Sequence, residues 1–270
     1  MDINVTETEK KFDDLKKILL GYKSLLIAFS GGVDSTFLLK VAKDVLGDKV
    51  LAVTALSETY AKEELEIAKK MASQIGVRQV LIESGEVDIP QFRENPPDRC
   101  YYCKYELFSQ LKKIAEKEGI ALVSDGTNFN DITSDHRPGM RASCELGVVS
   151  PLCEAKLNKE EIRYLSKKLS LPTWDKPEMA CLSSRFPYGT DITREKLLMV
   201  DDAERVLREL GFKQLRVRHH GEIARIELEK DAIEKMMDKE TRHQVIEKLK
   251  AIGFKYVALD LEGYRRGSMN

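Results

Sequence analysis

The feature that most constrains the fold is an apolar run followed by a glycine turn and a helical pattern. Residues 25–29 read Leu-Leu-Ile-Ala-Phe, which suits a short buried strand, and apolar residues recur at helical spacing from Phe37 to Val45, beyond the Gly31-Gly32 turn. A helical pattern at 6–20 precedes this unit, and strand-like or helix-like segments follow at 50–56, 61–75, 80–83, 104–117 and 120–125. This alternation predicts a parallel sheet with helices on both faces and ligands at the carboxyl ends of the strands.

The pattern changes after Pro172. A stretch rich in Pro, Ser and Gly leads to two strand-like runs, 214–218 and 223–228, which meet at a glycine turn and are flanked by helical patterns and a last strand. We therefore predict an α/β domain over 1–170, a linker carrying Cys181 over 171–190, and a smaller α+β domain over 191–270 that serves the substrate or oligomerisation. A homo-oligomer is expected.

Composition excludes several classes of protein. The chain has 44 Lys and Arg against 45 Asp and Glu, and this near-neutral balance disfavours a nucleic-acid-binding surface. No apolar run reaches the roughly 18–20 residues of a membrane helix, so no membrane association is expected. The N-terminal residues are acidic and polar, unlike a signal peptide, which predicts a cytoplasmic protein.

The strongest local motif is SGGVDST at residues 30–36, between the first strand and its helix; we call it the glycine loop. Glycines allow a tight turn with inward-pointing amides, and the helix N-terminus adds partial positive charge, so the loop suits phosphate oxygens. It lacks the GK[ST] of a Walker A loop. Asp34 suits Mg²⁺ or a helix cap, and a simple capped turn is the structural alternative. The candidate nucleotide ligands are Ser30, Gly31, Gly32, Asp34, Ser35 and Thr36.

Five cysteines in a long chain argue against a disulfide framework. Cys100 and Cys103 form a CxxC motif that opens a helix, and Cys181 on the linker is a plausible third ligand. A CxxC alone fits a redox pair, half a zinc site or part of an iron–sulfur site, and a purely structural role also remains open. Cys144 and Cys153 lack polar neighbours of that type and are expected in the core.

The glycine loop resembles the PP-loop of ATP pyrophosphatases, which split ATP to AMP and pyrophosphate, and Asp125-Gly126-Thr127-Asn128 resembles that superfamily's second nucleotide element. The resemblance implies that the loop holds pyrophosphate and that Gly126 contacts the nucleotide.

The ordered set of motifs SGGVDST, PDRCYYCK, DGTNFNDITSDHRPGMRA, ACLSSRFPYGT and LEGYRRGSMN resembles the LarE family of ATP-dependent sulfur transferases over nearly the whole chain. The resemblance implies that a carboxylate of a pyridinium biscarboxylate mononucleotide is adenylated and receives sulfur in nickel-pincer nucleotide biosynthesis. Three cysteines matching Cys100, Cys103 and Cys181 imply a [4Fe-4S] cluster whose open iron carries hydrosulfide, with sulfide or another donor recharging it. The expected cofactors are ATP, Mg²⁺ and this cluster.

Several basic residues fit a dicarboxylate substrate with a phosphate, because Arg makes bidentate contacts with such anions. Arg185, four residues after Cys181, and the strand pair Arg216 and Arg218 are candidates, and the resemblance adds Glu204. His219 and His220, beside a turn, are expected as exposed residues rather than as ligands. Trp174 could stack on a ring or anchor the linker by packing.

Other functions remain open from the sequence. Some family members sacrifice the sulfur of the cysteine matching Cys181, and some tRNA thiolation enzymes combine a PP-loop with three cysteines. An amide synthetase would leave the cysteines without a role, and a nucleotide- or cluster-sensing module would show no turnover.

Overall fold

The computed structural model describes residues 3–132, 138–177 and 180–265, which form two units. The first unit is Met1–Glu86 with Asp98–Met179, and the second is Val87–Pro97 with Ala180–Asn270. Parts of two sequence motifs, at 133–137 and 266–270, and residues 178–179 of the predicted linker lie outside the described residues.

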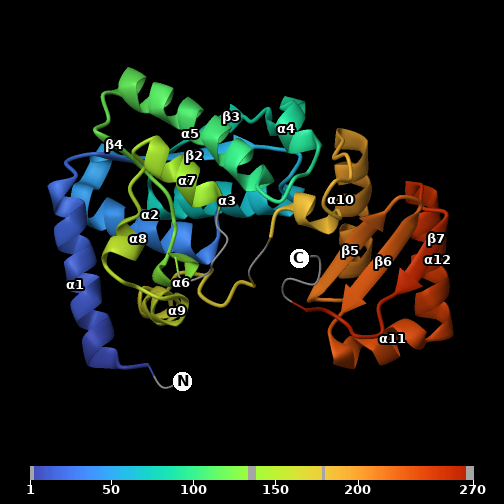
Figure 1. The fold of residues 1–270 in the computed structure, drawn as a ribbon. Helices are drawn as coiled ribbons and strands as arrows, with labels where there is room; N and C mark the ends of the chain where they lie inside the picture. The colour runs from blue at the N-terminus through green and yellow to red at the C-terminus, as the bar shows by residue number, and fades with distance from the viewer. Residues whose placement is uncertain (1–2, 133–137, 178–179, 266–270) are drawn as a thin grey trace. The chain divides into compact units, whose positions relative to one another are not determined.

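The first unit contains a parallel sheet whose strand order is β3-β2-β1-β4 (Figure 1). Its strands are β1 (Leu25–Ala28), β2 (Val50–Leu56), β3 (Arg78–Glu83) and β4 (Leu122–Ser124). The registers pair Leu25 with both Val50 and Leu122, so β1 lies between β2 and β4. The strand order reverses direction between β1 and β4, which is the switch point where parallel sheets bind ligands.

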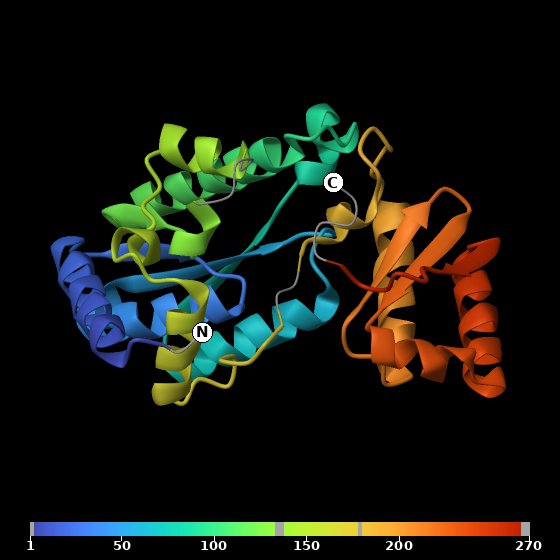
Figure 2. The ribbon, with the colours of Figure 1, turned by 60° about the horizontal axis from the view of Figure 1, so that its bottom comes forward.

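Helices cover both faces of this sheet. They are α1 (Val5–Gly21), α2 (Val33–Leu46), α3 (Lys62–Ile75), α5 (Arg99–Glu118), α6 (Phe129–Ile132), α7 (Pro138–Glu145), α8 (Pro151–Glu154) and α9 (Lys159–Lys168), with a 3₁₀ turn η1 (Gly47–Lys49). Figure 2 shows α5 on one side of the sheet and α3 on the other. Leu25 and Ile27 of β1 face a core shared with α1, α2, α3 and α9, whereas Leu26 faces a second core with Phe108 and Leu111 of α5. This alternation explains why β1 is apolar throughout, since both of its faces are buried.

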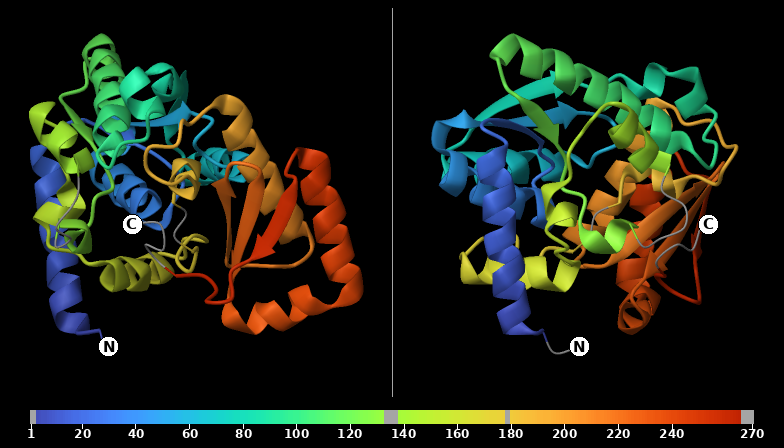
Figure 3. Two further views of the ribbon diagram at one scale, coloured as in Figure 1. Left: turned by 45° about the vertical axis from the view of Figure 1, so that its right-hand side comes forward. Right: turned by 60° about the vertical axis from the view of Figure 1, so that its left-hand side comes forward.

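The second unit contains a mixed sheet of order β5-β6-β7. Strands β5 (Leu215–His220) and β6 (Ile223–Leu228) are antiparallel across the Gly221 turn, and β7 (Tyr256–Leu259) runs parallel to β6. The helical elements are α4 (Pro90–Arg93), η3 (Leu182–Arg185), α10 (Arg194–Glu209), η4 (Lys230–Ala232), α11 (Ile233–Met237) and α12 (Lys239–Ile252), and η2 (Glu86–Asp88) spans the boundary. Helices α10 and α12 pack on one face of the sheet (Figure 3).

The predicted fold class, a parallel α/β domain followed by a smaller α+β domain, is confirmed. The residue pattern did not predict that Val87–Pro97 joins the second unit. There the amide of Asn95 donates to the carbonyl of Pro187 at 2.7 Å, and the backbone N–H of Gly189 donates to the carbonyl of Asn95 at 2.9 Å. No helix in the described ranges has the length and apolar content needed to cross a membrane.

Candidate active site

The glycine loop leaves β1 through a turn that only glycine accommodates. Gly31 has φ of +70°, and a Cβ there would lie 2.8 Å from the Cα of Ala68 on α3. A side chain at position 31 would therefore meet both a strained backbone conformation and the backbone of a neighbouring helix. This close packing fixes the position of the loop at the carboxyl end of β1.

Hydroxyl groups line the glycine loop where α2 begins. The Ser30 and Ser35 hydroxyl oxygens lie 3.1 Å apart, and the backbone N–H of Gly32 donates to the Ser30 hydroxyl at 3.4 Å. The Ser35 hydroxyl is 3.3 Å from the Gly32 carbonyl, to which it donates. Hydroxyl donors beside the first amides of a helix form an anion-binding arrangement.

Asp34 on α2 forms an ion pair that the sequence did not predict. Its Oδ2 lies 2.5 Å from the Lys159 ammonium, and both side chains are about one-fifth exposed. Lys159 begins α9, and its backbone N–H donates to the Asn130 side chain at 2.8 Å. A carboxylate and a cation thus stand together beside the glycine loop, able to contact a metal ion and phosphate oxygens respectively.

The loop after β4 closes against the glycine loop. A Cβ on Gly126 would lie 3.2 Å from the backbone N of Ser35, so a larger residue would crowd the start of α2. Asp125 holds this turn by accepting from the Thr127 backbone N–H at 3.1 Å and from the Ser150 hydroxyl at 2.7 Å. The predicted second nucleotide element therefore lies directly beside the first.

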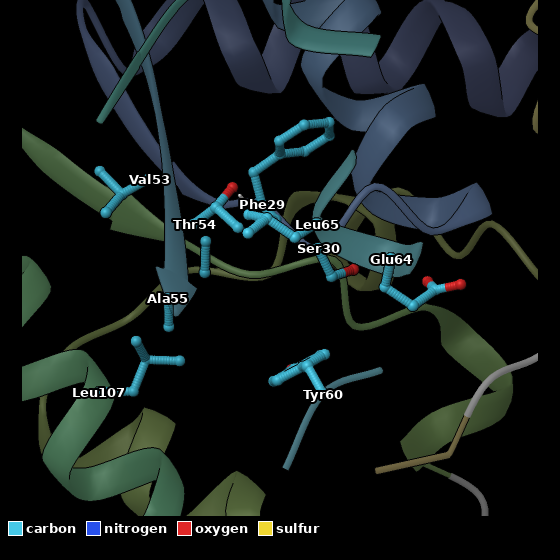
Figure 4. A pocket seen from close by; sticks show the side chains of 10 residues that line it. Phe29, Ser30, Val53, Thr54, Ala55, Tyr60, Glu64, Leu65 and Leu107 are labelled. Carbon is cyan, nitrogen blue, oxygen red and sulfur yellow. Dashed lines mark hydrogen bonds between the residues drawn. The ribbon is translucent and has the colours of Figure 1, made fainter. Parts of the chain in front are cut away.

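A mostly apolar pocket opens next to Ser30 at the ends of β1 and β2 (Figure 4). The Thr54 hydroxyl donates to the Phe29 carbonyl at 2.6 Å and holds the two strand ends together. An apolar recess beside a phosphate-binding turn fits a purine base. The sequence pattern did not predict its walls, which include Val53, Ala55, Tyr60, Leu65 and Leu107.

The cysteine pair lies at the start of α5, which begins five residues earlier than the predicted helix. Cys100 is exposed and Cys103 half-buried, and their i,i+3 spacing places them on one helical face. The neighbouring Lys104 ammonium is 3.7 Å from Asp125 Oδ2, so the pair lies close to the nucleotide elements. Within the described ranges, no group of three His, Cys, Asp or Glu residues is placed to hold a metal.

Cys181 precedes η3 in the second unit and is held through its backbone. Arg185 donates from Nη1 to the carbonyls of Ala180 at 2.8 Å and Cys181 at 3.1 Å. Its Nε and Nη2 donate to the two carboxylate oxygens of Glu204 at 2.8 and 3.0 Å, and neither side chain is exposed. The geometry makes Arg185 a residue that positions Cys181, rather than one presented to a substrate.

Glu204 is the centre of this buried network. It also accepts from the Val217 backbone N–H at 3.1 Å and from Arg208 at 3.0 Å. Burial raises its pKa, but the charge and hydrogen bond of Arg185, with Arg216 and Arg208, outweigh burial and leave the pKa below the usual range. Glu204 is therefore ionised and fixes α10 to β5.

Arg216 and Arg218 lie on the face of β5 opposite the helices. Arg218 donates to the Ser184 carbonyl and to Glu227, both at 2.8 Å. Arg216 is buried over the Tyr264 ring, and burial, followed by the charge of Arg185, lowers its pKa.

Arg225, directly opposite Arg218 on β6, also pairs with Glu227 at 3.0 Å. The sequence prediction missed Arg225 and Glu227, although alternation in β6 could have placed them on this face.

Four expectations about single residues are corrected. His219 is buried between the Phe186 and Phe254 rings rather than exposed, because it continues β5 on its inward face. Burial lowers its pKa, as it does for the half-buried His220. Cys144 is exposed, since the buried positions of α7 are Gly139, Ala142 and Ser143, and Cys153 is only half-buried, since those of α8 are Pro151 and Leu152.

Trp174 packs in the first unit, with the Lys167 ammonium 4.6 Å from its ring centre. This contact matches the packing alternative that the sequence left open.

Comparisons with known proteins agree with this geometry. Residues 4–133 match the model of a PP-loop domain. The chain is 43% identical over 245 residues to a pyridinium-3,5-bisthiocarboxylic acid mononucleotide synthase of Lactiplantibacillus plantarum, covering 90% of this chain and 88% of the relative. It is 45% identical over 262 residues to an uncharacterized protein of Synechocystis, covering 97% of each. A glutamine-hydrolyzing GMP synthase of Aeropyrum pernix is 29% identical over 206 residues, covering 67% of this chain and 38% of the synthase.

Proposed function

This chain belongs to the LarE family of ATP-dependent sulfur transferases, and from that premise we propose that it adenylates a carboxylate of a pyridinium biscarboxylate mononucleotide and then replaces AMP with sulfur. The observation that carries the proposal is the 43% identity to the synthase across nearly all of both chains. The substrate and the place of the step in nickel-pincer nucleotide biosynthesis are part of the proposal.

The first unit supplies the nucleotide chemistry. The substrate carboxylate attacks the α-phosphorus of ATP, and pyrophosphate leaves within the glycine loop, whose amides and hydroxyls receive the leaving charge. We propose Asp34 as a ligand of Mg²⁺, which would neutralise phosphate charge when bound. Lys159, which pairs with Asp34, is a further proposed contact of the pyrophosphate oxygens.

The second unit supplies an anion site for the substrate. Arginines 185, 208, 216, 218 and 225 gather with the carboxylates of Glu204, Glu227 and Asp260. Several guanidinium groups in a largely buried cluster support binding of a phosphate or carboxylate, because arginine makes bidentate contacts with such anions. Arg216 and Arg218 are the proposed contacts, with Arg185 and Glu204 holding the cluster and Cys181 in place.

The chemistry of the cysteines supports the proposal of a soft metal centre. Two thiolates one helical turn apart, with a third on a separate segment, suit a [4Fe-4S] cluster on Cys100, Cys103 and Cys181, which would supply the sulfur when bound. Each single Cys→Ala change should remove the absorbance near about 400 nm and sulfur transfer, but retain ATP binding. Cys144→Ala, exposed on α7, is the matched control.

Three further proposals concern the setting of the reaction. Sulfide or another small donor restores the sulfur, the protein forms a homo-oligomer, and it works in the reducing cytoplasm, where thiolates persist.

The adenylation step is tested by products. With ATP and the dicarboxylate nucleotide, we expect AMP and pyrophosphate in equal amounts together with a thiocarboxylate. Asp34→Ala should abolish turnover with the fold intact, whereas Asp44→Ala, an exposed position on the same helix paired with Lys40, should not. Stoichiometric ADP and orthophosphate would contradict the proposal.

A further inference from the structure

Lys176 lies five positions before Cys181, and its side chain contacts the nucleotide site of the first unit. Its ammonium donates to the carbonyl of Gly31 in the glycine loop at 3.2 Å and to Glu64 Oε2 at 2.8 Å. The side chains of Lys176 and Glu64 are each only 13% exposed. Figure 4 shows Glu64 beside Ser30 at one side of the apolar pocket. A single lysine therefore touches both the proposed phosphate site and the wall of the proposed base pocket.

The backbone around Lys176 is also fixed. Arg163 of α9 donates from Nη1 to the Trp174 carbonyl at 2.8 Å and from Nη2 to the Lys176 carbonyl at 2.7 Å. The backbone N–H of Lys176 donates to the Thr173 carbonyl at 3.1 Å. These contacts make residues 173–176 a defined turn rather than a loose linker.

Covalent geometry then limits where Cys181 can lie. Four residues lie between it and Lys176, which makes five steps from Cα to Cα, and a fully extended chain spans at most about 3.6 Å per step, or about 18 Å in total. Cys181 thus stays tethered to the glycine loop whatever position the second unit takes. A shorter or more firmly held tether raises the effective concentration of the sulfur-bearing group at the adenylate.

We propose that Lys176 is a positioning residue that anchors the Cys181 segment (residues 180–185) to the glycine loop, so that sulfur transfer outcompetes hydrolysis of the adenylate. The proposal rests on the proposed function. Lys176 acts through the backbone and takes no part in breaking or forming bonds. Without the anchor, water attacks the acyl carbon, and the carboxylate and AMP are released without sulfur.

The test compares pyrophosphate released with thiocarboxylate formed, using the full-length protein with its cluster. In Lys176→Met, which keeps the aliphatic chain and removes the charge, the ratio of pyrophosphate to thiocarboxylate should rise at least about tenfold, whatever the change in the rate of pyrophosphate release itself. Lys176→Arg should restore the ratio, because a cation again reaches the loop. Lys168→Met, which breaks a more exposed ion pair with Glu9 on the same unit, is the matched control.

A second variant avoids the ion pair altogether. Two glycines inserted after Pro177 lengthen the tether, and they should raise the same ratio while leaving pyrophosphate release intact. An unchanged ratio in both variants, or a parallel loss of both products, would overturn the role of Lys176. A wild-type protein that releases pyrophosphate but forms no thiocarboxylate would instead overturn the proposed function, and with it this role.

Discussion

Replacing Glu204 by alanine should destabilise the protein strongly, because it leaves Arg185 buried without its carboxylate partner. Both side chains are fully buried, and the pair is bidentate. Removing one partner of a buried ion pair costs about 3–5 kcal/mol, a large share of the roughly 5–15 kcal/mol by which a domain is stable. The matched control is Arg205→Ala on the exposed face of the same helix, which should leave the urea midpoint nearly unchanged.

The double variant Arg185→Met with Glu204→Leu separates stability from function. Apolar residues of similar volume can replace a buried ion pair at little cost. What remains is the loss of Glu204 as acceptor for the Val217 N–H and Arg208, and of Arg185 as donor to two carbonyls, and each buried group left unpaired costs about 1–3 kcal/mol. The urea midpoint of the double variant should therefore lie between those of Glu204→Ala and wild type. The dependence of the unfolding free energy on urea concentration should be unchanged. The rate of sulfur transfer in the double variant should be lower than in wild type, because the carbonyls of Ala180 and Cys181 have lost their donor. A midpoint for Glu204→Ala equal to that of Arg205→Ala, or no recovery in the double variant, would refute this reasoning.

Gly31→Ala should weaken ATP binding at least about tenfold by calorimetry, because a residue with φ of +70° and a Cβ 2.8 Å from Ala68 must displace the loop; an unchanged Kd would count against the assigned geometry. Leu107→Glu, at a half-buried pocket wall, should raise KM for ATP with little change in urea midpoint, and an unaltered KM would show that the base binds elsewhere. The pKa of His219 is lowered from 6.5 by burial, so its contribution to stability is present above pH 6.5 and is lost as the pH falls through the lower folded pKa. In His219→Phe the urea midpoint should fall less between about pH 7 and pH 5.5 than in wild type. An equal fall of the midpoint in both proteins would contradict burial of a neutral imidazole.

Local patterns made much of the fold predictable. Strand β1 is apolar because helices bury both of its faces, and the turn at Gly221 separates two strands whose bounds match the pattern within about two residues. The sequence could not predict that Val87–Pro97 packs with the second unit, because this packing depends on hydrogen bonds between Asn95 and a segment some ninety residues away.

The site was predictable where its chemistry is local. The glycine loop contains its own turn, hydroxyls and helix N-terminus within seven residues. Lys159 and Lys176 were missed because a lysine carries no positional pattern, and each reaches the loop from more than 120 residues away. Arg185 was expected to face the substrate, but only the structure shows its donors directed to Glu204 and to the backbone of the Cys181 segment.

The most direct test of the central claim counts product per protein chain. Protein purified without oxygen, carrying its cluster, is supplied with ATP, the dicarboxylate nucleotide and excess sulfide, and both the thiocarboxylate and the mass of the Cys181 peptide are measured. We predict several thiocarboxylates per chain, each matched by one pyrophosphate, with Cys181 unchanged in mass. A reaction that stops at one product per chain and leaves Cys181 lighter by one H₂S would contradict the account and establish a sacrificial cysteine.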